Sequence, residues 1–297
     1  MNIKHEKLTV LAPAKLNLSL DILGKASGGY HDLDSVMLAV DLCDTLTFTG
    51  TTGGGISFSC TDPELPTGKD NLALKAAGVF FAHTGILPGG LDIVLTKRIP
   101  IQAGLAGGSA DAAGVLAGLN RLYGAGIGEE ELAKVGLGIG SDVPFCLMGG
   151  LARAKGRGEI LTPFPPLPKG AVFVIAKPAE GMSTRLAFEM YDKRRGASSP
   201  PPRTQALIDA LYSGRLKAIG AAMSNAFEDV LQLSGVRDIK AVLLEFGAYG
   251  TAMTGSGTAV AGLFGDERAA VSCLERLRGI VTFACIARPL AHGPKIM

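Results

Sequence analysis

Apolar and polar residues alternate strictly along the first long segment of the chain. Between residues 15 and 22 the apolar side chains take one face and the polar ones the other: Leu16, Leu18, Leu20 and Ile22 against Lys15, Asn17, Ser19 and Asp21. A period of two is that of a β-strand, so the pattern predicts a strand over residues 8–23. Pro13 suits the start or the edge of such a strand.

The rest of the first half predicts a mixture of strands and helices. We expect strands near 35–40, 44–49, 56–60 and 91–96 and a helix over 71–83. Apolar residues at spacings of three and four between 112 and 122 predict a second helix, which Gly124 ends. A short helix follows over 129–137. Another is expected to begin at Ser141 as its cap, with Pro144 in its first turn.

A proline-rich stretch at 163–168 is the best candidate for a domain boundary. It suggests one domain over 1–163 and a second over 164–297, with a further polar, proline-rich loop at 194–203. The expected helices of the second domain are 206–213, 215–233, 238–246 and 267–278, and the expected strands are 251–254, 258–264 and 281–288. Mixed elements joined by short links indicate the α+β class.

Composition narrows the classes of protein that fit. The chain has 297 residues, of which 47% are hydrophobic and 19% charged, so it can bury a core. Its longest apolar runs, such as 171–176, are too short to cross a bilayer. The polar N-terminus does not resemble a signal peptide, and we therefore expect a cytoplasmic protein without a membrane partner.

Charge and cysteine content exclude two further kinds of site. The net charge is +2, there is no tryptophan and no basic stripe, so a nucleic-acid partner is not expected. The five cysteines are scattered and never spaced as CxxC, which favours buried thiols over a disulfide framework or a zinc site.

A glycine-rich segment at 99–111 is the strongest local signal for chemistry. Gly104, Gly107 and Gly108 allow backbone N–H groups to approach a phosphate before a helix N-terminus, and Ser109 offers a hydroxyl to an oxygen or a metal. The alternative is a tight turn that packs small residues. The segment is not a Walker A loop, because no GxxxxGK[ST] occurs, and the glycines at 136–140 match a Rossmann fingerprint only weakly.

Other candidate residues also have plain structural alternatives. Lys15 on a strand is commonly a solvated edge residue, and Asp142 beside a helix start is commonly a cap. Tyr30 and His31 follow a Gly-Gly turn and are either a recognition pair or structural. Residues 254–258 form either a hairpin turn or a second backbone cradle.

The order of these segments along the chain resembles that of the GHMP kinase superfamily. That superfamily has three sequence motifs in a fixed order. The segments of this chain that resemble them are Pro13-Ala-Lys-Leu-Asn17, residues 100–113 and Thr254-Gly-Ser-Gly-Thr258. Within the superfamily the resemblance is strongest to the 4-diphosphocytidyl-2-C-methyl-D-erythritol kinases, through Pro13–Leu18, Gly29-Tyr-His31 and Gly140-Ser-Asp-Val-Pro144. Gly28 departs from the aspartate that many members have before Gly-Tyr-His.

The resemblance implies a two-domain GHMP kinase fold, with a ribosomal-protein-S5-like N-terminal half that binds ATP and a ferredoxin-like C-terminal half. It implies Lys15 and Asp142 as the catalytic pair, and ATP with Mg²⁺ as cofactors. Implied ATP-binding residues are Pro100, Ile101, Gln102, Ala103, Gly104, Leu105, Ala106, Gly107, Gly108, Ser109 and Ala110, with Asn71 and Lys97 near the adenine.

The resemblance also implies the substrate, a cytidine-diphosphate-linked methylerythritol of the non-mevalonate isoprenoid pathway, whose 2-hydroxyl receives the phosphate. Tyr30, His31 and Phe188 would bind the cytosine, Ser183 and Thr184 would add hydroxyl contacts, and Asn17 would face the diphosphate or the erythritol. A monomer or a weak homodimer is expected. Two alternatives stay open: another GHMP kinase, of the homoserine or mevalonate type, and a catalytically silent nucleotide-binding sensor of the same fold.

Overall fold

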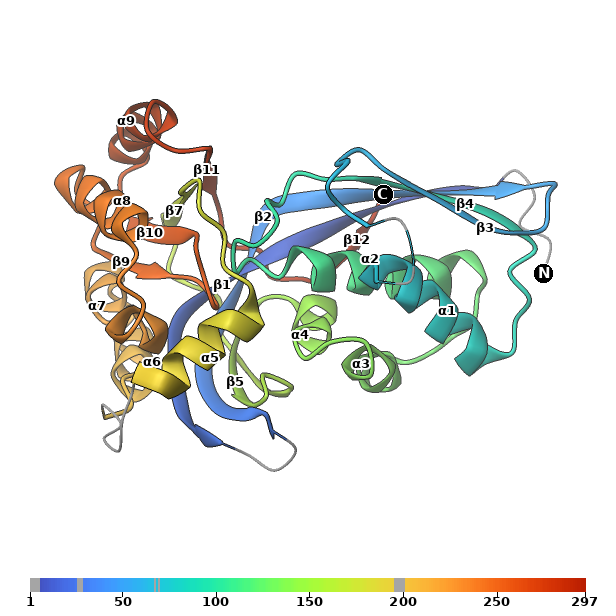
Figure 1. Ribbon diagram of the computed structural model, residues 1–297, viewed down its shortest axis with the longest axis horizontal. Helices are drawn as coiled ribbons and strands as arrows, with labels where there is room; N and C mark the ends of the chain where they lie inside the picture. The colour runs from blue at the N-terminus through green and yellow to red at the C-terminus, as the bar shows by residue number, and fades with distance from the viewer. Residues whose placement is uncertain (1–5, 26–28, 67, 69, 195–200) are drawn as a thin grey trace.

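The chain folds into two β-sheets with helices packed on them, as the computed structural model shows for residues 6–25, 29–66, 68, 70–194 and 201–297. Among these residues the larger sheet has eight strands, and its main path runs β12-β1-β2-β4-β3. The smaller sheet has four strands in the order β11-β7-β10-β9. The two sheets lie at opposite ends of the elongated molecule (Figure 1). This mixed architecture confirms the α+β class.

Two long antiparallel strands form the backbone of the first half. β1 (Lys7–Lys25) pairs with β2 (His31–Thr51) along nearly its whole length, and β4 (Gly90–Thr96) and β3 (Gly55–Cys60) extend the sheet. The predicted strands are thus confirmed, although those near 35–40 and 44–49 are one continuous strand. The polar face of β1 is buried as well, because the second half covers it.

The helices of the first half pack under this sheet (Figure 1). They are α1 (Leu72–Thr84), α2 (Gly107–Leu122), α3 (Glu129–Leu137) and α4 (Val143–Met148). All four were predicted. The expected cap of α4 is wrong, because the N-cap is Asp142 rather than Ser141, and no side chain makes a capping hydrogen bond there.

A hairpin that the sequence pattern did not predict joins the edge of β2. It consists of β5 (Leu151–Gly156) and β6 (Ile160–Phe164), so the proposed boundary between residues 163 and 164 falls inside β6. Two short strands from the second half, β8 (Ser224–Asn225) and β12 (Lys295–Ile296), pair with β1. The C-terminal segment therefore returns to the N-terminal sheet.

The second half is built on four antiparallel strands. They are β7 (Val172–Lys177), β9 (Gly250–Met253), β10 (Val260–Phe264) and β11 (Phe283–Ala287). The helices α8 (Ser234–Glu245) and α9 (Glu267–Arg278) pack on the outside of this sheet. The apolar run at 171–176 is the fully covered strand β7, which explains why it is apolar on both faces.

α5 (Thr184–Arg194) and α6 (Thr204–Ser213) lie near the junction between the halves, and α7 (Leu216–Ala221) packs on β9 and β10 of the second half. The predicted helix over 215–233 is wrong, because it stops at Ala221. The Asn225 side chain accepts from Phe227 N and donates to the carbonyl of Met253, and such bonds compete with a helix. In the predicted loop at 194–203, residues 195–200 lie outside the described residues. None of the helices in the described ranges is long and apolar enough to cross a membrane.

Candidate active site

One cavity of about 930 Å³ lies where the two halves meet. Its walls come from β1, the start of β2, the glycine-rich segment, the segment before α4, and α5. Most of the residues singled out in the sequence line it: Lys15, Asn17, Tyr30, His31, Lys97, all residues from Pro100 to Ser109, Asp142, Ser183, Thr184 and Phe188. The volume is that of a typical small-molecule site.

Asn71 and Ala110 are the two predicted ATP-binding residues that do not line the cavity. Asn71 caps α1: its Oδ1 accepts from Ala73 N at 2.9 Å and its Nδ2 donates to the Pro66 carbonyl at 2.8 Å. Ala110 is buried inside α2, with its N–H bonded to the Ala106 carbonyl. Both residues hold the frame of the site in this structure.

The glycine-rich segment is pressed against the turn at residues 254–258. Gly104 has a φ of +73°, and a Cβ there would lie only 1.9 Å from the Thr254 carbonyl oxygen. Ala106 also has a positive φ, of 56°, which is unusual for a residue with a side chain. α2 begins directly after it, and the first N–H groups of a helix have no partner within the helix. The segment thus offers unpaired donors to a phosphate at the cavity wall.

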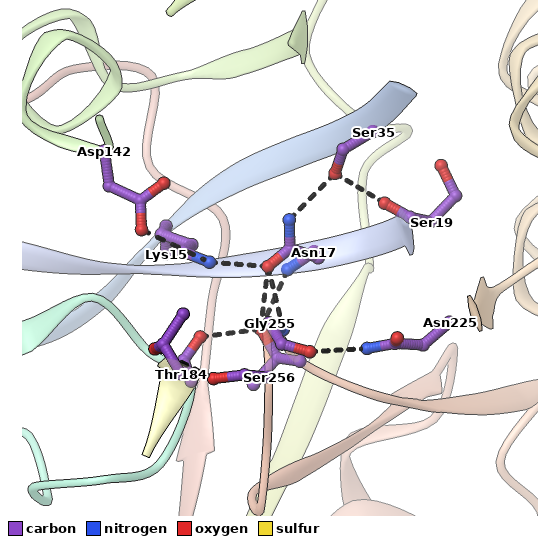
Figure 2. Close-up of polar contacts among 11 residues, drawn as sticks. Lys15, Asn17, Ser19, Ser35, Asp142, Thr184, Asn225, Gly255 and Ser256 are labelled. Atoms are coloured by element: carbon purple, nitrogen blue, oxygen red, sulfur yellow. Dashed lines mark hydrogen bonds and ion pairs between the residues drawn. The ribbon is translucent and has the colours of Figure 1, made fainter. Parts of the chain in front are cut away.

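Lys15 and Asp142 face each other across the cavity floor, with 3.8 Å between Lys15 Nζ and Asp142 Oδ2 (Figure 2). The lysine side chain is 5% exposed and the aspartate side chain 32%. The backbone N–H of Lys15 donates to the Leu105 carbonyl at 3.2 Å, which ties β1 to the glycine-rich segment. The Asp142 carboxylate is therefore accessible to a ligand, while the Lys15 ammonium is almost fully buried beside it.

Asn17 connects the first motif to the third. Its Oδ1 accepts from Lys15 Nζ at 2.5 Å and from Gly255 N at 2.9 Å, and its Nδ2 donates to Ser35 Oγ at 2.8 Å (Figure 2). Its backbone N–H donates to Thr254 Oγ1 at 2.9 Å. Both polar atoms of the Asn17 side chain thus have partners within the protein, whereas the family resemblance implied that Asn17 faces the substrate. It orients the lysine and anchors the turn.

Lys97 is fixed beneath the glycine-rich segment by two carboxylates that the sequence did not reveal. Its Nζ lies 2.5 Å from Asp44 Oδ2 and 2.9 Å from Asp111 Oδ2. Burial raises the pKa of Asp111 to about 8, although Lys97 opposes the shift. Asp111 Oδ1 is buried and has no hydrogen-bond partner among the described residues. Asp44 Oδ1 accepts from the backbone N–H of Ile99 at 2.9 Å, which fixes the entry to the segment.

The aromatic residues gather at the other end of the cavity. His31 stacks on Phe188, with ring centroids 4.4 Å apart and planes 17° apart. Tyr30 is 52% exposed, and the Arg157 guanidinium lies 4.4 Å from its ring centroid. Phe188 comes from α5, so both halves contribute to this aromatic cluster, as the sequence predicted. Arg157 was missed, because nothing in its local sequence places it beside Tyr30.

The two hydroxyl residues before Phe188 lie at the start of α5. Ser183 Oγ accepts from Leu186 N at 3.3 Å, which caps the helix. Thr184 Oγ1 lies 3.1 Å from Ser256 Oγ, so α5 contacts the turn of the third motif (Figure 2). Ser183 and Thr184 thus share the cavity with the aromatic cluster, and they join it to the third motif.

Comparison with known proteins identifies this arrangement. Residues 71–150 match the family model described as "GHMP kinases N terminal domain", and residues 207–280 match "GHMP kinases C terminal". The chain belongs to the GHMP kinases. It is a kinase, hence a phosphotransferase, and the fold expected from the motifs is confirmed.

A curated relative from Alkaliphilus metalliredigens, a 4-diphosphocytidyl-2-C-methyl-D-erythritol kinase, is 40% identical over 266 residues, which cover 89% of this chain and 90% of that protein. A crystal structure of 4-(cytidine 5'-diphospho)-2C-methyl-D-erythritol kinase superimposes with a TM-score of 0.79 at 32% identity, covering 96% of this chain and all of the other. Within the GHMP kinases, the chain therefore belongs to this group.

A homoserine kinase from Cytophaga hutchinsonii has a TM-score of 0.77 and covers 98% of each chain, but its identity is 20%. That likeness shows the fold alone.

Proposed function

We propose that this GHMP kinase transfers the γ-phosphate of ATP to the 2-hydroxyl of 4-diphosphocytidyl-2-C-methyl-D-erythritol, in the pathway that makes isoprenoid precursors without mevalonate. One observation carries the proposal. A single cavity joins a glycine-rich phosphate cradle, a lysine–aspartate pair and an aromatic cluster to which both halves contribute. The named relatives act on the same substrate.

Asp142 is the general base in this proposal. A hydroxyl that attacks phosphorus has to lose its proton, and an exposed carboxylate within reach accepts it. Lys15, 3.8 Å away, offsets negative charge as it develops on the attacking oxygen. Because the acceptor is a hindered tertiary alcohol, its orientation in the cavity contributes to the rate as much as proton transfer does.

ATP is the phosphate donor of the family, and the N-terminus of α2 together with the segment 100–109 would hold its phosphates. Among the described residues no cluster of three or more His, Cys, Asp or Glu side chains could hold a metal ion. Mg²⁺ nevertheless fits, because it prefers oxygen ligands and keeps waters and phosphates around it. The Ser109 hydroxyl would hold it, and the ion would neutralise charge on the β- and γ-phosphates.

The cytidine half of the substrate would lie among Tyr30, His31 and Phe188. Stacking of a base on aromatic side chains contributes about 1–3 kcal/mol. Arg157 would face the diphosphate. Its guanidinium lies over the Tyr30 ring. The next residue, Gly158, is close to the catalytic carboxylate, since a Cβ built on it would lie 3.7 Å from Asp142 Oδ1. A cation is thus available between the base and the reacting hydroxyl.

ADP release in a coupled assay tests the proposal. With ATP, Mg²⁺ and the cytidine substrate we expect steady turnover, and with the acceptor left out we expect almost none. The silent-sensor alternative predicts no turnover with any acceptor, and that result would contradict the proposal. Binding of ATP measured by calorimetry in the same sample confirms that the protein is intact.

A further inference from the structure

Asp192, which lines the cavity together with His31, connects the edge of the His31 ring to Lys25. His31 Nε2 lies 2.8 Å from Asp192 Oδ1, and Lys25 Nζ lies 2.8 Å from Asp192 Oδ2. Asp192 follows Phe188 by four residues on α5, so both side chains lie on one face of the helix. The same face thus stacks on the His31 ring through Phe188 and hydrogen-bonds its edge through Asp192.

The contact settles which ring nitrogen carries a proton. Burial would raise the pKa of Asp192, but the hydrogen bonds from Lys25 and His31 outweigh it and hold the pKa below its usual value. A carboxylate can only accept hydrogen bonds, so Nε2 of His31 is the protonated nitrogen. In the tautomer that carries its proton on Nε2, the other ring nitrogen, Nδ1, is an acceptor.

Nδ1 of His31 has no hydrogen-bond partner within the described part of the chain, and His31 lines the cavity. An acceptor at this position suits the amino group of cytosine, which donates. Uracil has a carbonyl oxygen at the same place and would meet a second acceptor. A site built to pair with one polar edge rejects the other strongly, because the mismatched groups stay unpaired.

We propose that Asp192 is a specificity-determining positioning residue: it fixes the tautomer and orientation of His31, and thereby makes the site select cytidine over uridine nucleotides. The inference rests on the proposed function for the identity of the substrate. Asp192 acts through His31 and does not take part in phosphate transfer. Lys25 supports it by holding the second carboxylate oxygen.

Removal of the carboxylate tests the role. Asp192→Ala should raise the KM for the cytidine substrate about tenfold and leave kcat within about twofold. The ratio of kcat/KM for the cytidine substrate to kcat/KM for its uridine counterpart should also fall about tenfold. The reason is that the freed His31 ring can turn its N–H toward the carbonyl of uracil. Asp192→Asn keeps an acceptor oxygen and should restore most of the preference. An unchanged preference in a folded Asp192→Ala protein would overturn the proposal.

Two controls separate this role from a general effect on α5. Lys193→Ala removes an exposed side chain of the same helix that does not line the cavity, and it should leave the nucleotide preference unchanged. In a His31→Ala background, Asp192→Ala should have no further effect on KM, because its action passes through the ring. If Asp192→Ala raises KM by the same factor with and without the His31 ring, the inference is contradicted.

¹⁵N NMR of the wild-type histidines provides a test that needs no Asp192 variant. The chain has four histidines, and His31→Ala assigns the relevant signals. We expect the shifts of a ring protonated at Nε2 and bare at Nδ1, and the opposite tautomer would overturn the proposal. If the wild type phosphorylates a different alcohol, the proposed function fails, while the NMR result still decides whether Asp192 sets the tautomer.

Discussion

At the scale of single residues, the site separates groups that react from groups that orient them. Asp142 is partly open to the cavity, while Lys15 and Asn17 are almost fully buried. The lysine cannot move freely, because Asn17 Oδ1 accepts from its Nζ. A buried ammonium with a fixed position keeps a positive charge beside the reacting atoms without any rearrangement during the reaction.

Asp142→Asn should lower kcat by a factor on the order of 10²–10⁴, because an amide does not accept the proton of the hydroxyl. The KM for ATP should stay within about threefold of the wild type. Ser141→Ala changes the neighbouring residue and serves as the control. Steady-state kinetics with both variants measure this, and near-normal turnover by Asp142→Asn would remove Asp142 from the mechanism.

Asp111 makes the stability of the fold depend on pH. Its pKa is raised by burial to about 8, from an ordinary value of about 4. The folded state thus binds this proton more tightly than the unfolded state. The contribution of Asp111 is fully present below the unfolded pKa and is lost as the pH rises through about 8.

Asp111→Asn mimics the protonated acid at every pH and should therefore remove this loss. The variant should therefore gain stability relative to the wild type as the pH rises. The difference in free energy of unfolding, variant minus wild type, should be clearly larger at pH 8.5 than at pH 5. Urea unfolding at both pH values measures the difference. An equal difference at the two values would mean that Asp111 is ionised in the folded protein throughout this range.

At the scale of elements, strongly periodic segments could be predicted and weakly periodic ones could not. α3 and α9 have the bounds that the sequence predicted. α5 was missed because only Ala187 and Tyr191 of its residues are buried and, unlike α3, it has no acidic residues in its first turn to mark its start. The hairpin of β5 and β6 was missed because both strands are short and β5 carries Arg153 and Lys155.

In the candidate site, too, features that are local in sequence could be predicted and contacts between distant segments could not. The motifs that carry Lys15 and Asp142 are local in sequence and could be recognised. The partners of His31 and Lys97 could not, because Asp192 lies 161 residues from His31 and Asp44 lies 53 residues from Lys97. Such pairs depend on the tertiary fold, which brings distant elements together.

Gly104→Ala tests the close contact between the glycine-rich segment and the turn at 254–258. Gly126 has a similar positive φ, of +69°, but open space around it, so Gly126→Ala is the matched control. Both variants should lose about 1 kcal/mol from backbone strain. Gly104→Ala should lose more stability than this and also weaken ATP binding, because its Cβ would collide with the Thr254 carbonyl and displace the glycine-rich segment. Thermal melting and calorimetry with ATP measure the two effects, and equal ATP affinities would contradict the contact's role.

At the scale of the whole molecule, the two halves that enclose the cavity are joined by a network of hydrogen bonds. Asn17 on the long strand of the first half bonds Thr254 and Gly255 of the second, and Thr254 Oγ1 donates to the Gly104 carbonyl at 3.2 Å. The three motifs of the family therefore converge on one point, from positions more than 230 residues apart along the chain.

Asn17→Ala should lower both stability and kcat, because it leaves Lys15 Nζ and Gly255 N without an acceptor. Each buried group left unpaired costs about 1–3 kcal/mol. Asn120→Ala is the control: its side chain also makes two hydrogen bonds, with Ile127, but lies away from the cavity. It should lower stability alone, and a similar kcat for the two variants would show that Asn17 has no role in orienting Lys15.

A competition between acceptors tests the central claim most directly. The wild-type protein is given ATP, Mg²⁺ and equal concentrations of 4-diphosphocytidyl-2-C-methyl-D-erythritol, mevalonate and homoserine, and the products are followed by ³¹P NMR. The account predicts a new phosphate monoester on the cytidine substrate, with its diphosphate intact, and almost none on the other two alcohols. Preferential phosphorylation of mevalonate or homoserine would contradict it.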